Sequence, residues 1–322
     1  MDKTGISGIG ATVERPPHIE WEETNCLLCG SEKWKPIIEA PDRTPGLGGV
    51  VFCVVQCQEC GLCYTNPRPN DKTLGQFYPV TYSPHKPFRP AQTKRQSRRY
   101  SSLLKWLDND QPNTQEKAYR GRLLDFGCGS GLFLKRMRGL GWDVMGVDIS
   151  QDTVFRLKHD LDIPAVVGTL PHPDLKPGTF DVVTMWQALE HVPWPRQILE
   201  AAKDLLVPGG KLVIAVPNIA SLPFKWFQKA WFALELPRHL THFTPETLQR
   251  MIESCGLQNG PLKMIRHSNW LRLSAGLANK HLQWSLKYRL LQTKIPSSLV
   301  SWYSYLTKQT DCMMTMAVKP TN

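Results

Sequence analysis

Two cysteine pairs near the start of the chain have the spacing of metal ligands. Cys26 and Cys29 are followed by glycine as C-x-x-C-G, and so are Cys57 and Cys60, with 27 residues between the pairs. Four such thiolates suit tetrahedral zinc, and each glycine allows the turn that brings backbone amides toward sulfur. The sequence therefore predicts a closed structural zinc site, with no open coordination position for catalysis.

Cys53 permits a second interpretation of the same region. With Cys57 and Cys60 it forms C-x3-C-x2-C, a spacing that holds an iron–sulfur cluster in radical enzymes. This interpretation leaves Cys26 and Cys29 without a role, and the chain lacks the strand series of the barrel that such enzymes use. We favour zinc, with an iron-binding or a metal-free cysteine cluster as the alternatives.

A glycine-rich stretch, LLDFGCGSG from Leu123 to Gly131, has the composition of a nucleotide-binding loop. Its pattern is D-x-G-x-G-x-G, and glycine lets a backbone approach its ligand closely. The acid, Asp125, suits a ligand that carries an ammonium and a sulfonium better than one that carries phosphates. Asp148, in GVDIS, is placed to accept hydrogen bonds from both ribose hydroxyls.

Alternating strands and helices are expected to position this loop. Apolar strands are predicted at 121–127, 142–150, 164–168, 180–186, 211–218 and 311–320, and helices at 130–141, 153–161, 195–206 and 243–256. Such alternation indicates an α/β fold, with a parallel sheet covered by helices. Ligands of such sheets bind beyond the carboxyl ends of the strands.

Several motifs taken together resemble one enzyme family. LLDFGCGSG, GVDIS, FDVVTMWQALEHV, LVPGGKLVIAVPN and the closing AVKP are similar to class I S-adenosylmethionine-dependent methyltransferases, over about residues 120–260 and 311–319. The resemblance implies a Rossmann-like seven-stranded domain that binds S-adenosylmethionine. A nicotinamide-binding Rossmann domain is the alternative.

The resemblance also implies roles for particular residues. The glycines would shape the methionine pocket, Asp148 would contact the ribose, and Ile149 would pack on the adenine. Thr169 would replace the acid that the family often places near the adenine amino group, and Trp186 with Gln187 would line the methyl donor. The cofactor residues so assigned are Asp125, Gly127, Gly129, Gly131, Asp148, Ile149, Thr169, Leu170, Trp186 and Gln187.

Three histidines are candidates for a general base. Removing the proton of a hydroxyl acceptor typically accelerates transfer by about 10²–10⁴-fold. His191 follows the fourth predicted strand, and His239 and His242 follow the fifth. Each has a structural interpretation as well, capping a loop or bridging to Glu190 or Glu235. Among them we favour His242, then His239, then His191.

The chain divides into regions of different composition. We expect a flexible tail at 1–20, a zinc-ribbon-like module at 21–70, a basic linker or helical cap at 71–115 and the methyltransferase domain at 116–322, with a basic, aromatic-rich insertion at 261–310. The exit of the module, CGLCYTNPRP, also resembles the N-terminal zinc module of certain bacterial methyltransferases. No apolar stretch of about 18 residues or secretory signal is present, which favours a reducing, cytoplasmic location.

Positive charge is concentrated in two segments. The net charge is +11, yet 72–107 and 254–310 each hold eight Lys or Arg and no acid. Such asymmetry favours an anionic partner over a merely solvated face. Aromatic residues are interspersed with lysines at 221–236, as in a lid helix, a wall for an apolar acceptor, or an interfacial anchor.

The function predicted from these features is O-methylation of a small or lipid-linked anionic acceptor, such as a nucleotide sugar, a glycan or a secondary-metabolite intermediate. A peripheral contact with the inner face of the membrane is compatible with it. RNA methylation is the alternative, because a zinc module with basic, aromatic-rich flanks also suits nucleic acid. An inactive protein that only binds the cofactor is the third interpretation.

Overall fold

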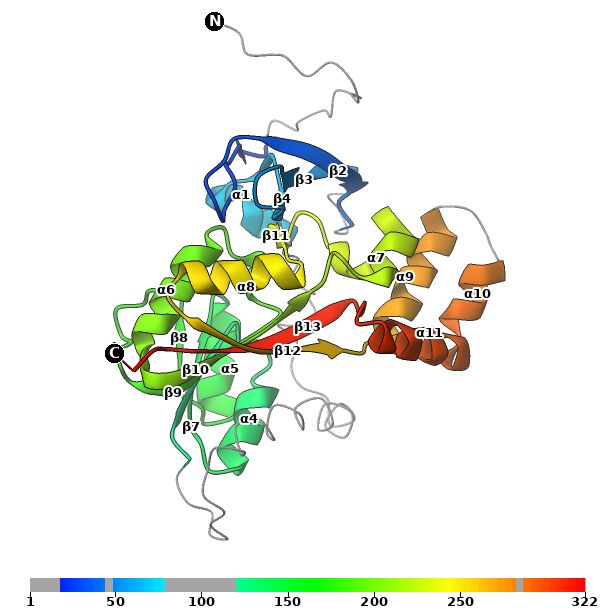
Figure 1. The fold of residues 1–322 in the computed structure, drawn as a ribbon. Helices are drawn as coiled ribbons and strands as arrows, with labels where there is room; N and C mark the ends of the chain where they lie inside the picture. The colour runs from blue at the N-terminus through cyan, green and yellow to red at the C-terminus, as the bar shows by residue number, and fades with distance from the viewer. Residues whose placement is uncertain (1–17, 44–48, 79–119, 282–285, 322) are drawn as a thin grey trace, which may run out of the picture.

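The structure is a computed structural model that describes residues 18–43, 49–78, 120–281 and 286–321 (Figure 1). Most of the expected tail at 1–20 and of the expected basic linker at 71–115 therefore lies outside the described residues. None of the described helices has the length and apolar character needed to cross a membrane.

A seven-stranded sheet forms the centre of the molecule (Figure 1). Its order is β12-β13-β10-β9-β6-β7-β8, and only β13 runs against its neighbours. The strands are β6 (Arg122–Phe126), β7 (Asp143–Asp148), β8 (Ala165–Val167), β9 (Phe180–Trp186), β10 (Leu206–Pro217), β12 (Gln258–Ile265) and β13 (Cys312–Val318). This confirms the predicted α/β class and its Rossmann-like seven-stranded sheet.

Alternate residues of the central strands bury opposite faces of the sheet. Leu123 and Val182 pack into one apolar cluster, with α4 and α5, while Leu124 and Val183 pack into another, with α6 and α8. The near-continuous apolar runs of these strands follow from burial on both faces. The helices are α4 (Leu132–Gly139), α5 (Gln151–Asp160), α6 (Pro195–Leu205) and α8 (Pro245–Ser254).

The N-terminal module is built on two small sheets. Its elements are β1 (Trp21–Glu22), β2 (Trp34–Pro41), β3 (Val51–Cys57), β4 (Cys63–Thr65), β5 (Arg68–Pro69), α1 (Asp71–Leu74) and a 3-10 turn at Gly75–Phe77. β1 pairs with β5, and the second sheet has the order β11-β4-β3-β2. Its edge strand β11 (Thr241–His242) comes from the other half of the chain, with Thr241 opposite Tyr64.

The module shares its core with the domain built on the seven-stranded sheet. Leu62 and Tyr64 are fully buried in the same cluster as Phe243 and Met251, which lie beyond β11. The Arg250 side chain on α8 also donates to the backbone oxygen of Cys60 at 3.0 Å. The two parts are thus joined by a sheet, a core and a hydrogen bond across about 190 residues of sequence.

A helical insertion lies between β12 and β13, and Figure 1 shows it beyond the end of the sheet. Its helices are α9 (Ser268–His281), α10 (Leu286–Gln292) and α11 (Lys294–Leu306). Its helical part begins at Ser268, later than the expected start at residue 261, because residues 258–265 form the edge strand β12. The aromatic segment at 221–236 forms α7 (Leu222–Phe227) and two 3-10 turns (Gln228–Ala230, Phe232–Leu234), which pack on α9.

Candidate active site

The glycine-rich loop follows β6 and has a backbone that requires glycine. Gly127, Gly129 and Gly131 have φ values of +70°, +50° and +72°, which side chains disfavour. A Cβ atom on Gly127 would lie 2.8 Å from the Cβ atom of Ala188, in the loop after β9. The loop after β9 therefore lies directly against the glycine-rich loop.

Asp148 ties the glycine-rich loop to the end of β7. Its carboxylate is 4% exposed and accepts hydrogen bonds from the backbone N–H of Gly129 at 2.8 Å and of Ser150 at 2.9 Å. These bonds use one site on each oxygen, and an ionised carboxylate has about four acceptor sites. The next side chain, Ile149, is 78% exposed, which suits contact with a flat apolar ring.

Asp125 is buried behind the loop and is held by one side chain. Thr184 on β9 donates a hydrogen bond to its Oδ1 atom at 2.6 Å. Burial raises the pKa of Asp125 to about 8; the hydrogen bond from Thr184 opposes this rise, and the negative charge of Asp148 adds to it. A bound cation near Asp125 would favour the ionised carboxylate.

We predict that Asp125 makes the stability of the unliganded protein depend on pH. Its pKa is about 8 in the folded protein and its ordinary pKa, expected in the unfolded chain, is 3.8. The unfolded chain therefore releases this proton first, and stability falls as pH rises from about 4 to about 8. Asp125→Asn removes this dependence. The unfolding temperature of the variant, relative to that of the wild type, should therefore rise steadily from pH 5 to pH 8. Calorimetry without ligand measures this gain; a constant difference would contradict the prediction. Asp143→Asn, at the exposed start of β7, is the control.

The remaining predicted cofactor residues line the ends of β8 and β9. Thr169 is exposed and Leu170 is buried in the loop after β8. Trp186 ends β9 and meets the ring of Phe133 edge-on, with centroids 5.3 Å apart. Gln187 has a φ of +54° and donates from Nε2 to the sulfur of Cys312 at 3.4 Å. These residues lie at the carboxyl edge of the sheet, with the glycine-rich loop.

The three histidines differ in what their ring nitrogens contact. His242 is 4% exposed, and burial lowers its pKa to about 3. Its Nε2 atom lies 3.2 Å from the Thr65 hydroxyl, which itself donates to the backbone oxygen of His239. His242 must therefore donate to Thr65, and it links β11 to the module.

His239 and His191 lie side by side, with ring centroids 4.6 Å apart. His239 is 3% exposed, its Nδ1 donates to the backbone oxygen of Ala233 at 2.9 Å, and burial lowers its pKa well below the usual range. His191 is only partly buried, and its Nδ1 lies 3.1 Å from both the Arg238 backbone oxygen and the Tyr78 hydroxyl. A carbonyl oxygen only accepts, so Nδ1 of the neutral ring carries the proton and Nε2 is its accepting nitrogen.

Glu190 places a buried carboxyl beside these two rings. Its side chain is 1% exposed, and neither of its oxygens has a hydrogen-bond partner among the described residues. Burial raises its pKa well above the usual range, which keeps it protonated in this environment. The ligand atoms of Glu190, His191 and His239 lie within 4.8 Å of one another, a donor set that suits a proton relay or a divalent cation.

The four cysteines of the two C-x-x-C-G pairs come together in the module. All four sulfur atoms lie within 4.8 Å of one another, with Cys26 and Cys60 at 3.3 Å and Cys29 and Cys57 at 3.6 Å. Tetrahedral zinc with Zn–S bonds of about 2.3 Å requires sulfur atoms roughly 3.8 Å apart. The donor set and its size thus fit zinc, and Cys53 is not part of the cluster.

Comparison with known proteins identifies the domain that carries the glycine-rich loop. A family profile described as a methyltransferase domain matches residues 91–261, more than half of the chain. The chain belongs to this methyltransferase family. The protein is therefore an S-adenosylmethionine-dependent methyltransferase, and the loop and acids described above form its candidate site for the methyl donor.

Curated relatives support the same assignment. The chain is 31% identical over 179 residues to a ubiquinone biosynthesis O-methyltransferase of Paraburkholderia phymatum, and 32% identical over 183 residues to one of Xanthomonas euvesicatoria. These matches cover 51% and 52% of this chain, and 74% and 76% of those proteins. About half of this methyltransferase thus lies outside the matched regions.

Solved methyltransferase structures are more distant from this chain. One from Archaeoglobus fulgidus is 19% identical with a TM-score of 0.47, covering 70% of this chain and 94% of that one. Another from Mesorhizobium loti is 16% identical with a TM-score of 0.45, covering 68% and 97%. Both are described as S-adenosylmethionine-dependent methyltransferases.

Sequence reasoning missed two residues that the structure places at this site. Tyr78 contacts His191 from the end of the module, and its position cannot be inferred because 113 residues separate the two. Glu190 was considered only as a partner for a histidine, although a carboxyl in the apolar stretch ALEHV is a signal of an unusual buried acid.

Proposed function

We propose that the methyltransferase transfers the methyl group of S-adenosylmethionine to an oxygen atom of a small or lipid-linked anionic acceptor, such as a nucleotide sugar or a glycan intermediate. The observation that carries this proposal is the contact between the two loops. Gly127 has no space for a side chain because Ala188 lies against it, and Ala188 is three residues before His191. This contact supports our proposal that His191 acts on the acceptor beside the donor site.

The residues of the site would divide the work of binding and proton transfer. Asp148 and Ile149 would hold the nucleoside, and the backbone of the glycine-rich loop would pass close to the methionine part. His191 Nε2 would take the acceptor's hydroxyl proton as the oxygen forms its bond to the methyl carbon. S-adenosylmethionine would supply the methyl group, and its sulfur would keep the electron pair of the carbon–sulfur bond.

Methylation of oxygen is supported by two features. The curated relatives are named O-methyltransferases. A hydroxyl acceptor must also lose a proton, and His191 Nε2 is the atom that we propose accepts it. The anionic character of the acceptor rests on the net charge of +11 and its concentration in two acid-free segments.

We also propose that the cysteine cluster holds one structural zinc ion. The module then serves the active site by fixing β11, since Thr65 on β4 contacts both His242 and the backbone of His239. RNA methylation stays the alternative function, and the same basic segments support it.

His191→Ala tests the proposed base. Turnover should fall by about 10²–10⁴-fold, the usual contribution of a general base. Affinity for S-adenosylmethionine should stay unchanged, because His191 is placed on the acceptor side. His159→Ala, on α5, is the matched control, and a fully active His191→Ala enzyme would remove His191 as the base.

A further inference from the structure

The last helix of the insertion, α11, exposes its apolar face. Its buried residues are Ser297, Ser301 and Ser304. The large side chains that it exposes are Ile295 (75%), Leu299 (65%), Trp302 (50%), Tyr303 (56%), Tyr305 (43%) and Leu306 (74%). A helix at a protein surface normally buries its apolar face, whereas α11 buries serines and exposes its large apolar side chains.

Packing against α9 fixes this orientation. Small side chains let two helices approach closely, and α9 presents Ala275 and Ala278, both fully buried. Two serine hydroxyls are satisfied within α11, Ser297 by the backbone oxygen of Thr293 and Ser304 by that of Val300. These two hydroxyls therefore need no hydrogen bond with water, so both side chains can be buried.

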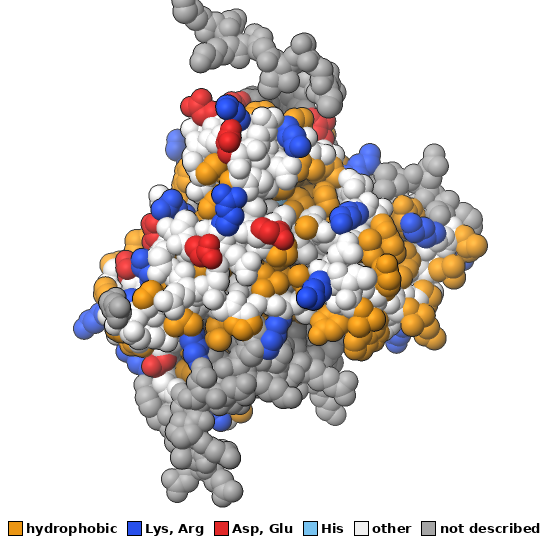
Figure 2. Space-filling model, viewed as in Figure 1, with side chains coloured by type: hydrophobic (Ala, Val, Ile, Leu, Met, Phe, Trp, Pro, Cys, Tyr) orange, Lys and Arg blue, Asp and Glu red, His pale blue; other side chains and the backbone are white. Residues whose placement is uncertain are grey.

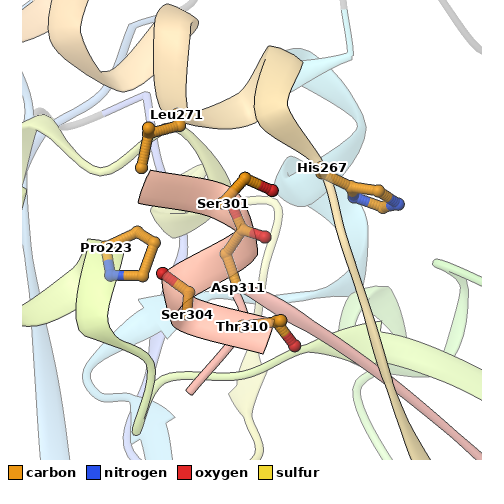
Figure 3. A pocket seen from close by; sticks show the side chains of 7 residues that line it. All are labelled: Pro223, His267, Leu271, Ser301, Ser304, Thr310 and Asp311. Carbon is orange, nitrogen blue, oxygen red and sulfur yellow. The ribbon is translucent and has the colours of Figure 1, made fainter. Parts of the chain in front are cut away.

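Figure 3 shows the inner side of α11 in its packed position. Ser301 and Ser304 lie on the side of the helix that faces Pro223 and Leu271, around a cavity of about 10 Å³. This is roughly the space that one water molecule needs. The inner side is thus already filled, and there is no room for the outer leucines to turn inward.

The neighbouring helix α10 extends the same surface and adds positive charge. Leu286 and Leu290 are 67% and 50% exposed. Basic residues occur in and next to these helices in the sequence, namely Arg266, Lys287, Arg289, Lys294 and Lys308, and no Asp or Glu occurs between 254 and 310. Figure 2 shows hydrophobic and basic side chains, without acidic ones, over α10 and α11 on the face in view.

We propose that this apolar-basic face, formed by the outer sides of α10 and α11, docks on the surface of an anionic lipid bilayer. Leu and Ile side chains would enter the boundary between headgroups and acyl chains, with Trp302 and the tyrosines at the level of the headgroups. Lys and Arg would be attracted to anionic lipids. The described helices are too short and polar to span the bilayer, so the contact is peripheral.

A lipid surface fits this face better than a nucleic acid. Ile295, Leu299 and Leu306 are the most exposed of the large apolar side chains on α11. These aliphatic groups, unlike Trp302 and the tyrosines, offer no ring on which a base can stack. The inference concerns a surface outside the active site, and it holds whatever acceptor the enzyme methylates.

Vesicle co-sedimentation of the full chain tests the proposal. The protein should sediment with vesicles of phosphatidylcholine and phosphatidylglycerol in equal parts, less with phosphatidylcholine alone, and less at high salt. The double variant Leu299→Ser/Leu306→Ser should bind the anionic vesicles about tenfold more weakly or worse, because two aliphatic side chains no longer leave water. Phe155→Ser, which removes a side chain 60% exposed on α5, is the matched control.

Three outcomes of these measurements would overturn the proposal. Equal vesicle binding by the wild type and the double variant would overturn it, and so would no sedimentation with either vesicle. A wild-type dimer that the double variant converts to a monomer, without vesicle binding, would assign the face to a second copy of the chain. Unchanged affinity for S-adenosylmethionine in all variants shows that they fold, and no acceptor is needed for any of these measurements.

Discussion

Asp148→Ala should weaken the binding of S-adenosylmethionine by about a hundredfold or more. The backbone N–H groups of Gly129 and Ser150 donate one bond to each oxygen of this carboxylate, and we expect the two ribose hydroxyls of the methyl donor to add one bond each. Each hydrogen bond to a charged group contributes about 1.5–3 kcal/mol, so losing two gives an effect of this size. The loop itself also loses its tie to β7. Isothermal calorimetry measures the change in affinity.

Asp143→Ala is the matched control for this effect, because Asp143 begins the same strand. Its side chain is 53% exposed and pairs with Arg122 at 3.1 Å, away from the loop. The control should bind the methyl donor as the wild type does, with a small change in stability. Equal affinity of Asp148→Ala and the wild type would contradict the assignment of the ribose contact.

The second large effect is expected at the cysteine cluster. Cys57→Ser should lose about one equivalent of metal and lower the unfolding temperature by ten degrees or more. A structural zinc site typically binds with about 10–16 kcal/mol, and about 1 kcal/mol corresponds to 2–4 °C in a domain of roughly this size. Methyl transfer should fall too, because β4 holds the segment with His239 and His242. Elemental analysis and calorimetry measure both changes.

Cys53→Ser separates the two interpretations of the cysteine motif. Cys53 lies on β3 outside the cluster, and its sulfur faces the backbone oxygen of Val54 at 3.6 Å. The variant should keep the metal and the stability of the wild type. Loss of metal in Cys53→Ser but not in Cys26→Ser, in a brown protein absorbing near 400 nm, would favour an iron–sulfur cluster instead.

The candidate donor site could be recognised in the sequence because its signals are local. Glycine spacing, an acid at a strand end and apolar runs each depend on a few neighbouring residues, and the structure brings Gly129 and Asp148 within hydrogen-bond distance. The two C-x-x-C-G pairs are similarly local signals, and their four sulfur atoms form one cluster. The edge strand β12 was missed, because Gln258, Asn259, Gly260 and Pro261 give it no apolar alternation.

The acceptor side could not be predicted in the same way, because it depends on contacts between distant segments. Nothing near His242 in the sequence shows that β4 pairs with it, which buries it and gives its ring a structural partner. The order of the histidine candidates changes for this reason, and His191 becomes the favoured base. Likewise, the residue types of α11 do not reveal that its serines face inward.

Transfer of a labelled methyl group tests the central claim most directly. Purified enzyme and labelled S-adenosylmethionine are added to fractionated host extract, with and without nuclease, and Asp148→Ala serves as the inactive control. We expect label in a nuclease-resistant glycan, nucleotide-sugar or lipid fraction, released as an O-methyl group, and little label with the variant. Label that disappears after RNase treatment would contradict a small or lipid-linked acceptor and would identify RNA as the substrate.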